Sequence, residues 1–469
     1  MMRNDLSGNI RRVSYVLISL IIVLFLHISY IQVIESNFLI SHPLNRRSVE
    51  YEKKNARGAV LDRNGEKLAY SEKDDSNGYR RVYPYGAIMA HLIGYNSIKL
   101  GKNGIESSYN GYLSGLSNPD RGLGPVSQLF VNNQAYDVTL TIDASLQSAA
   151  YKALGNNRGA IVVIEPRSGA VLAMVSKPSF DPNNIEKNWD DISNSIVSPL
   201  LNRATNGLYP PGSIIKPMIA EAALAEKVVS LKETINCRGT LKIGPDYVLS
   251  ENNNKAHGVV DLSKAIAVSC NVTFGSLALE LGSSRIARTF DRYGFNKSNS
   301  REFNESASRL PDFAKLGDGD LAQVGIGQGS LLVTPFRMAM LASTFANSGT
   351  TMKPHIISRI ARTDGNVIQN HVPEEWLKPL DKKSSDIITD MLVDVVESGT
   401  GISAQIKNIT VAGKTGTAEN PHGASHAWFI GFAPADNPEV AIAVIVENGG
   451  SGGGVAAPIA RQVLLQALR

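Results

Sequence analysis

The apolar run near the N-terminus constrains this chain most. Residues 13–34 read VSYVLISLIIVLFLHISYIQVI and contain no Asp, Glu, Lys or Arg. A helix rises ~1.5 Å per residue, so a run of this length spans the ~30 Å apolar core of a bilayer. We therefore predict a transmembrane anchor at residues 13–34, with the chain before it and the chain after it on opposite sides of a membrane.

The charges that flank the run predict its orientation. Three arginines precede it against one aspartate, and the first charged residue after it is Glu35. Positive residues stay on the cytoplasmic side of a membrane. We expect residues 1–12 to form a cytoplasmic tail and the body of a single-pass plasma-membrane protein to lie outside the cytoplasm.

A cleavable signal peptide is the alternative interpretation. The apolar region of a signal peptide is ~7–15 residues long and is followed by a cleavage site of small residues. The sequence VIESNFLI at 33–40 contains no A-x-A pattern. We favour an uncleaved anchor.

The size and composition of the chain indicate a globular body of more than one domain. The chain has 469 residues, with 43% hydrophobic and 19% charged residues and a formal net charge of +4. Such a length is ample for two or three domains. No concentrated basic stretch with interleaved aromatic residues is present, so we expect no nucleic acid partner.

Two regions follow the anchor. The segment 35–57 is polar and basic and reads as an extended stalk, and short strand-like pieces broken by turn pairs continue to about residue 150. We interpret 35–150 as a small, mainly-β N-terminal module that serves as a dimerisation or pedestal-like unit. Residues 151–469 form the main domain.

The main domain has strands at both ends and helices between them. A hairpin is predicted at 159–176, and apolar strands return between 409 and 447. Apolar residues at helical spacing, each followed by a glycine, predict three helices between these strands. These helices are expected at 261–282, 335–349 and 384–399. We predict an α+β domain in which one antiparallel sheet is covered by helices, with an all-helical lobe.

The first candidate catalytic motif is YPPGSIIKP at 209–217. Ser213 and Lys216 are three residues apart and share one face of a helix. A serine hydroxyl needs a base to become a nucleophile, and a lysine can act as that base only when burial or a nearby cation makes its amine neutral. Pro217 cannot donate a backbone hydrogen bond, so a carbonyl beside Ser213 should be released. A plain helix start is the structural alternative.

The second motif has two candidates in the sequence. Ser250 and Asn252 lie in the very polar run SENNNKAHG, which predicts a loop. Ser269 and Asn271 lie in an apolar helical stretch, where buried polar side chains need partners. We choose Ser269 and Asn271, with hydrogen bonding at a helix end as the alternative explanation.

The third motif is GKTGTA, on an apolar strand. Lys414 supplies a positive charge, Thr415 and Thr417 supply hydroxyl groups, and Gly416 allows close approach of the backbone. A strand of this composition suits an anionic ligand. The RSG triplet at 167–169 is superficially similar but lies in a hairpin turn, so we discount it.

Metal and nucleotide sites are not predicted. The sequence has no HExxH and no recognisable cysteine–histidine cluster, so we expect no metal and no cofactor. The glycines of GIGQG at 325–329 resemble part of a dinucleotide motif but lack the strand–turn–helix context. Cys237 and Cys270 are the only cysteines, and whether they pair is left open because sequence does not set their separation.

Together the three motifs are far more specific than any one of them. The order S-x-x-K, S-x-N, K-T-G is the active-site set of the penicillin-recognising serine acyltransferases. The chain resembles the class B penicillin-binding proteins, monofunctional transpeptidases of peptidoglycan, and among them the smaller members. Further segments that carry the resemblance are RGAVLDRNGEKLA (57–69), RVYPYGAIMAHLIGY (81–95), GIESSY (104–109), LTIDASLQ (140–147), VSKPSFDPN (175–183), GIGQGSLLVTP (325–335) and WFIGFAP (428–434).

The resemblance implies a role for each motif residue. Ser213 attacks the peptide bond between the two terminal D-alanines of a stem peptide, and Lys216 is its general base. Ser269 passes the proton to the leaving D-alanine, and Asn271 holds Lys216 and the substrate amide. Lys414, Thr415 and Thr417 bind the terminal carboxylate, and Gly416 completes the substrate-binding strand.

The resemblance also implies partners and alternatives. The expected ligands are peptidoglycan stem peptides and β-lactam antibiotics, and the expected membrane partner is a glycan polymerase of the SEDS family. A D,D-carboxypeptidase and a catalytically weak penicillin-binding sensor or scaffold remain alternatives. A β-lactamase is disfavoured by the anchor and the N-terminal module. The sequence does not distinguish a role in division, elongation or sporulation.

Overall fold

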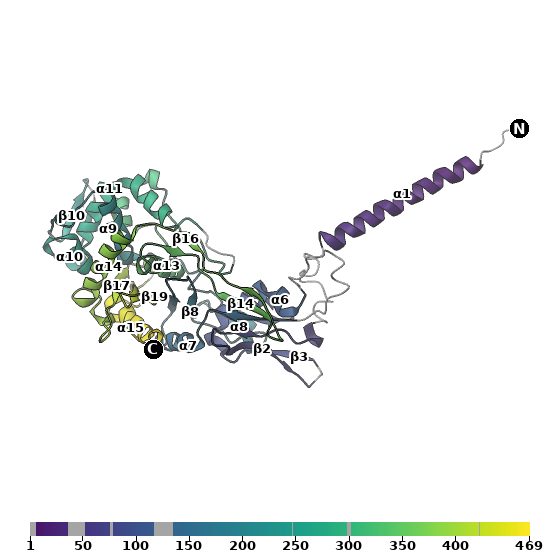
Figure 1. The fold of residues 1–469 in the computed structure, drawn as a ribbon. Coiled ribbons are helices and arrows are strands. Elements are labelled where there is room, and N and C mark those ends of the chain that lie inside the picture. Colours follow the sequence, from purple (N-terminus) through teal and green to yellow (C-terminus); the bar gives the residue numbers. More distant parts are fainter. Residues whose placement is uncertain are drawn as a thin grey trace.

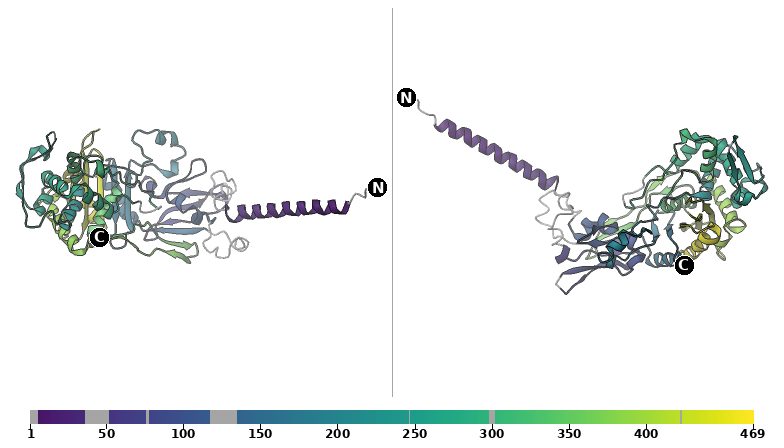
Figure 2. Two further views of the ribbon diagram at one scale, coloured as in Figure 1. Left: turned by 90° about the horizontal axis from the view of Figure 1, so that it is seen from above. Right: turned by 180° about the vertical axis from the view of Figure 1, so that it is seen from behind.

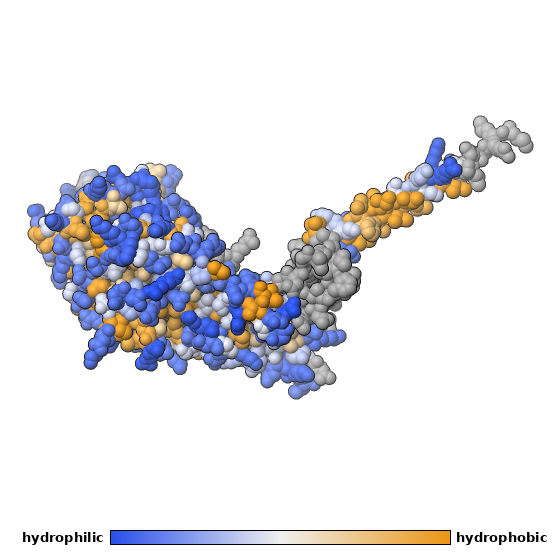
Figure 3. Space-filling view, viewed as in Figure 1, coloured by the Kyte–Doolittle hydropathy of each residue, from blue (hydrophilic) through white to orange (hydrophobic). Residues whose placement is uncertain are grey.

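A computed structural model of the protein describes residues 6–35, 52–75, 78–116, 135–245, 247–297, 302–421 and 423–469. The first five residues of the predicted tail and most of the predicted stalk, 36–51, lie outside the described residues. Helix α1 (Leu6–Val33) projects from the body, and its exposed apolar side chains form a band along its length (Figures 1 and 3). Its stretch Gly8–Gln32 is long and apolar enough to cross a bilayer.

A five-stranded antiparallel sheet forms the centre of the body. The strand order is β17-β18-β19-β7-β8. The strands at both ends of the predicted main domain therefore meet in one sheet, as the sequence predicts. Their bounds are β7 Gly159–Ile164, β8 Val171–Lys177, β17 Ala412–Ala418, β18 His426–Ala433 and β19 Val440–Val446.

Both faces of this sheet are covered, because almost every residue of its strands is buried. Neighbouring residues of β18 point to opposite faces, so Ile430 belongs to one apolar cluster and Phe429 to the other. Helix α13 (Pro335–Ala346) packs on the first face and is buried along its whole length. Helices α7 (Ala144–Ala153) and α15 (Ala457–Ala467) cover the second face.

The helical lobe lies at the end of the body remote from α1 (Figures 1 and 2). Small two-stranded sheets border it. Its helices are α9 Lys216–Ala225, α10 Leu262–Ala267, α11 Asn271–Arg292, α12 Asp318–Gly325 and α14 Lys382–Glu397. The bordering strands are β9 Ile235–Cys237, β10 Thr240–Ile243, β11 Tyr247–Ser250 and β12 Gly258–Val260. The α+β architecture with a helical lobe is confirmed.

One predicted helix is wrong in its continuity. The pattern at 261–282 indicated a single helix, but the chain breaks between α10 and α11 at Ser269, which has a φ of 60°. Left-handed backbone is uncommon for a residue other than glycine and is frequent at functional sites. The apolar pattern continues through the break because Val268 packs against the core and Cys270 is buried, so periodicity alone did not reveal it.

A second sheet joins the early part of the chain to a later hairpin. Its strand order is β15-β14-β6-β1-β2-β3. Strand β6 runs parallel to β1 and antiparallel to β14, so residues 357–370 extend a sheet that begins in the N-terminal region. The strands are β1 Val60–Leu61, β2 Lys67–Lys73, β3 Tyr79–Val82, β6 Tyr136–Leu140, β14 Ile357–Arg362 and β15 Val367–Asn370.

Candidate active site

The turn that carries Ser213 is held from two sides. It is a short 3-10 helix, Gly212–Ile215, that continues directly into α9. Trp428 of β18 donates its indole Nε1–H to the Pro210 carbonyl at 3.0 Å, and the Gly212 amide donates to the Gly327 carbonyl at 2.8 Å. The GIGQG loop therefore packs against the Ser213 turn.

Pro217 does not leave a free carbonyl beside Ser213, contrary to the expectation from the sequence. Because the turn is 3-10, the Ser213 carbonyl accepts a hydrogen bond from the Lys216 amide. Pro217 lies in the first turn of α9, where its missing N–H would have no helical partner in any case. The proline thus fits the change from a 3-10 turn to an α-helix.

Lys216 joins the first two motifs. Its fully buried Nζ donates to the Asn271 Oδ1 at 2.8 Å and to the Ser269 carbonyl at 2.7 Å, and the Ser269 hydroxyl is 3.3 Å away. The Phe274 ring lies 5.5 Å from the same nitrogen. Asn271 begins α11, so the break at Ser269 is what turns these polar groups toward Lys216.

Lys414 joins the third motif to the second. Its buried Nζ donates to the Ser269 hydroxyl at 2.9 Å and to the Thr415 carbonyl at 3.0 Å. The Ser269 hydroxyl therefore lies between two lysine nitrogens. All of the lysine, serine and asparagine side chains predicted for catalysis, apart from the Ser213 hydroxyl, form one connected hydrogen-bond network.

The two buried lysines have lowered pKa values. Burial lowers the pKa of Lys216 to about 8, against the opposing effect of the Glu251 carboxylate. Burial, and then the charge of Lys216, lower the pKa of Lys414 well below its usual value. Two ammonium groups that contact one serine hydroxyl disfavour each other's charge, which adds to the effect of burial.

Ser213 lies on the 3-10 turn that leads into Lys216 and α9. Ser213 is partly exposed, and within the described part of the chain its hydroxyl has no hydrogen-bond partner. Hydrogen bonds between a nucleophile and its base are often long before a substrate binds. The sequence-predicted pair is thus placed on one turn, with the base already oriented by other residues.

The β17 strand lies beside the Ser213 turn. A Cβ atom at Gly416 would lie 3.1 Å from the Pro211 carbonyl and 3.0 Å from an Ile214 methyl group, so glycine permits this close packing. Thr415 is paired through its hydroxyl with Thr400 at 2.6 Å. Thr417 is exposed, and its hydroxyl accepts a hydrogen bond from the Gly452 amide at 3.3 Å.

The rejected candidate at 250–252 lies beside the site rather than in it. The Ser250 side chain is exposed, and only its backbone carbonyl meets the site, where it accepts from the Asn271 Nδ2 at 3.1 Å. The intervening residue, Glu251, is buried and accepts a hydrogen bond from the Val272 amide at 2.7 Å.

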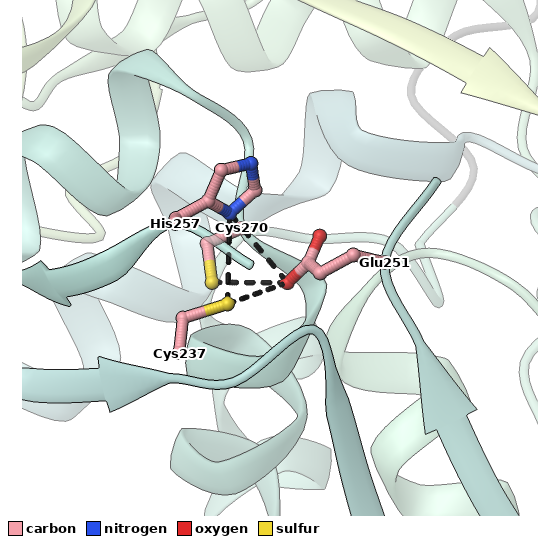
Figure 4. A group of neighbouring side chains, drawn as sticks. All are labelled: Cys237, Glu251, His257 and Cys270. Atoms are coloured by element: carbon pink, nitrogen blue, oxygen red, sulfur yellow. Dashed lines mark hydrogen bonds and ion pairs between the residues drawn. The ribbon is translucent and has the colours of Figure 1, made fainter. Parts of the chain in front are cut away.

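Four buried or partly buried side chains, one of them next to Asn271 in the chain, form a cluster that the sequence did not reveal. They are Cys237, Glu251, His257 and Cys270, and their donor atoms all lie within 4.8 Å of one another (Figure 4). Both cysteines are free thiols, so the disulfide left open from the sequence is not formed. The expectation of no cysteine–histidine cluster was therefore wrong. The sequence did not reveal it because these residues are 14, 6 and 13 residues apart and match no short motif.

Comparison with protein families identifies both parts of the body. Residues 159–465 match the sequence model described as penicillin binding protein transpeptidase domain. Residues 57–134 match the model described as penicillin binding protein A dimerisation domain. The chain belongs to the penicillin-binding protein transpeptidase family, as a class B member, and its members are serine acyltransferases.

Two curated relatives illustrate this membership. The chain is 31% identical over 499 residues to peptidoglycan D,D-transpeptidase PbpA of Mycolicibacterium smegmatis, and the match covers 99% of each chain. It is 33% identical to peptidoglycan D,D-transpeptidase MrdA of Acinetobacter baumannii, over 80% of this chain and 64% of that relative. The chain therefore spans just under two thirds of the second relative and nearly the whole of the first.

Solved structures of penicillin-binding proteins are similar to the fold of this chain. Penicillin-binding protein A of M. tuberculosis, as a ceftriaxone acyl-enzyme complex, has a TM-score of 0.83 at 29% identity, over 90% of this chain and 100% of that one. Pseudomonas aeruginosa PBP2 has a TM-score of 0.76 at 34% identity, over 89% and 96% of the two chains.

Proposed function

We propose that the protein is a peptidoglycan D,D-transpeptidase that cross-links stem peptides through an acyl-enzyme at Ser213 and is acylated there by β-lactams. The observation that carries the proposal is the network around Ser269, whose hydroxyl lies within 3.3 Å of both Lys216 and Lys414. Relatives over the full length of the chain are named peptidoglycan D,D-transpeptidases, which supports the substrate class.

In the proposed acylation step, neutral Lys216 takes the proton of the Ser213 hydroxyl while the serine oxygen attacks the carbonyl of the penultimate D-alanine. The Ser213 and Thr417 amides then receive the oxyanion, an arrangement worth ~10²–10³ in rate per donor. Close approach of the turn to β17 supports it, since a Cβ at Gly212 would lie 3.0 Å from the Thr417 carbonyl.

Ser269 is the proposed proton carrier to the leaving D-alanine, because its hydroxyl touches both lysines. Asn271 fixes Lys216 through its Oδ1. Lys414, Thr415, Gly416 and Thr417 are proposed to form the binding strand for the terminal carboxylate. An amine from a second stem peptide then attacks the acyl-enzyme, and Ser213 is released.

We further propose a single-pass topology with the N-terminus in the cytoplasm and the catalytic body outside it, on the basis of the arginines before α1. The apolar faces of α1 are exposed and are the proposed contact for a membrane-embedded glycan polymerase of the SEDS family.

The test uses the full-length protein in detergent with a polymerised, uncross-linked glycan. We expect cross-linked stem-peptide dimers with release of one D-alanine per cross-link, measured by mass spectrometry of digested product. Ser213→Ala should give neither product. Release of D-alanine from the wild type without dimers would contradict the transpeptidase assignment and favour a carboxypeptidase.

A further inference from the structure

Phe274 is a buried aromatic residue that the proposed mechanism does not use, although its ring lies against the proposed base. The Lys216 Nζ lies over the Phe274 ring, 5.5 Å from the ring centroid. An ammonium group within ~6 Å of an aromatic ring is attracted by the negative face of that ring. Both side chains are fully buried, and such attractions are stronger away from water.

The helix that carries Phe274 explains how the ring comes to lie there. Asn271 and Phe274 are three residues apart at the start of α11, so their side chains share one face of the helix. The Asn271 Oδ1 accepts a hydrogen bond from the Lys216 Nζ at 2.8 Å, and the Phe274 ring lies beside the same nitrogen. Because the chain breaks at Ser269, α11 begins where this face meets Lys216.

The hydrogen bonds of Lys216 show what the ring adds. The Nζ donates to the Ser269 carbonyl at 2.7 Å and to the Asn271 Oδ1 at 2.8 Å, and both of these oxygens only accept. A neutral amine has two N–H groups, so it can form both bonds as an ammonium does. The attraction to the ring face requires the positive charge. The ring therefore distinguishes the two protonation states of Lys216.

The charges around Lys216 act together with the ring. Among the described residues, the titratable groups that face its Nζ are Lys414 on β17, Glu251 after β11 and Cys270 at the start of α11. Burial lowers the pKa of Lys216 to about 8, and Glu251 and Cys270 oppose this lowering. Lys414 and Lys216 disfavour each other's charge. The ring acts in the same direction as Glu251 and Cys270, and its face can be altered while all of these charges stay in place.

We propose that Phe274 is a positioning residue whose ring face stabilises the ammonium that Lys216 becomes when it takes the Ser213 proton, and that it thereby sets the pH midpoint and the limiting rate of acylation. With a penicillin, the Ser213 Oγ gives its proton to the Lys216 Nζ and bonds to the lactam carbonyl carbon. The bond from that carbon to the lactam nitrogen breaks, and the nitrogen receives the proton. This inference rests on the proposed role of Lys216 as the general base.

A weaker ring face should change two quantities together. The ammonium form of Lys216 loses stabilisation, so the amine is neutral at lower pH and the midpoint of the acylation profile falls. Complete loss of the attraction corresponds to a shift of ~0.4–1.5 pH units. The amine is then also a weaker base, so the limiting rate at high pH should fall by at most the corresponding ~2.5–30-fold.

The first experiment replaces Phe274, in the full-length protein in detergent, by phenylalanines that carry increasing numbers of ring fluorines. Fluorine withdraws negative charge from the ring face and changes the shape of the side chain little, so packing is kept while the attraction for a cation decreases. The second-order rate of penicillin acylation is measured against pH. We expect the midpoint and the limiting rate to fall progressively with fluorination, with little change in melting temperature.

Phe290 is the matched control site. It is fully buried on the same helix, and its ring neighbours are Phe295 and Phe313. The same fluorinated residues at this site should leave both the midpoint and the limiting rate unchanged. A midpoint that does not respond to fluorination of Phe274, or that moves equally for the two sites, would overturn the proposed role of the ring.

The second experiment reads the protonation of Lys216 without acylation. The protein contains isotope-labelled lysine, and the NMR signal of the Lys216 side chain is identified by its absence from Lys216→Arg. The pH midpoint of this signal should fall on fluorination of Phe274 by the same amount as the acylation midpoint. Absence of acylation in the wild type would contradict the proposed function alone. An NMR midpoint that fluorination leaves unchanged would overturn the role of Phe274 whether or not the protein is acylated.

Discussion

At the scale of single residues, the main feature of the site is that two buried lysines contact the same serine hydroxyl. The Ser269 hydroxyl accepts a hydrogen bond from the Lys414 Nζ at 2.9 Å and lies 3.3 Å from the Lys216 Nζ. Both lysines are buried, and Ser269 is partly exposed. Burial disfavours the charged form of a lysine, and a second ammonium nearby disfavours it further. The arrangement thereby lowers the free-energy cost of a neutral amine on the Ser213 turn.

This arrangement predicts the pH dependence of acylation. The pKa of Lys216 is lowered to about 8, so the fraction of neutral amine increases as the pH rises through that value. The second-order rate of penicillin acylation should rise about tenfold per pH unit below pH 8 and level off above it. The check is the rate of labelling by fluorescent penicillin across this range, with circular dichroism to show that the protein stays folded.

Lys216→Arg is the matched variant, because a guanidinium keeps its proton at every accessible pH. We expect a loss of at least ~10²-fold in acylation, as for removal of a general base. A wild-type rate that does not change with pH would argue against Lys216 as the base.

The variant Ser269→Gly removes the hydroxyl and keeps the backbone conformation of the turn. Glycine adopts a φ of 60° without strain, so the fold should be kept. The hydroxyl that both lysines contact is then absent. We expect penicillin acylation to fall ~10²–10⁴-fold and the melting temperature to change little. Near-normal acylation by a folded Ser269→Gly protein would show that the hydroxyl is not needed for proton transfer.

At the scale of elements, the GIGQG loop acts as a support for the Ser213 turn. Gly327 has a φ of 79°, and a Cβ there would lie 2.0 Å from the Gly212 carbonyl. Gly329 has a nearly equal φ of 75°, but a Cβ there would meet only the Gln323 side chain at 3.6 Å. The two glycines share the same backbone preference and differ in what surrounds them.

Alanine substitution at each glycine should therefore distinguish the cost of left-handed backbone from the cost of a steric clash. Gly329→Ala should cost about 1–2 kcal/mol of stability, as expected for left-handed backbone. Gly327→Ala adds a clash with backbone and should cost more than ~3 kcal/mol or displace the turn, with a large loss of acylation. Denaturant unfolding and labelling rates measure both effects, and equal losses in the two variants would contradict this role of Gly327.

At the scale of the whole molecule, the pattern of apolar residues predicted helices and strands more successfully than the breaks and pairings between them. The hairpin at 159–176 and the returning strands were predictable because their apolar runs are bounded by turn residues, and Asp143 was recognisable as an N-cap. The break at Ser269 was not predictable, because Val268 and Cys270 on either side of it both pack against the core. The hairpin at 357–370 joins a sheet whose other strands precede residue 141, a pairing that no local pattern encodes.

The same distinction holds for the site. Ser213, Lys216 and Lys414 were predictable because each lies in a short motif with its own chemistry. The cluster of Cys237, Glu251, His257 and Cys270 was not, because its members come from four separate places along the chain.

The proposed topology gives a prediction for the whole chain. With a tag on the N-terminus and right-side-out spheroplasts, an added protease should digest the body and leave the tag protected by the membrane. The arginines before α1 are the physical reason. Loss of the tag with the body retained would show the reverse orientation.

The central claim is that Ser213 is the acylated nucleophile. The most direct measurement is mass spectrometry of the intact protein and of its peptides after treatment with penicillin. We predict one adduct per chain, carried by the peptide that contains Ser213, absent from Ser213→Ala and retained in Ser250→Ala, whose exposed side chain lies outside the network. An adduct that persists in Ser213→Ala, or that maps to another residue, would contradict the account.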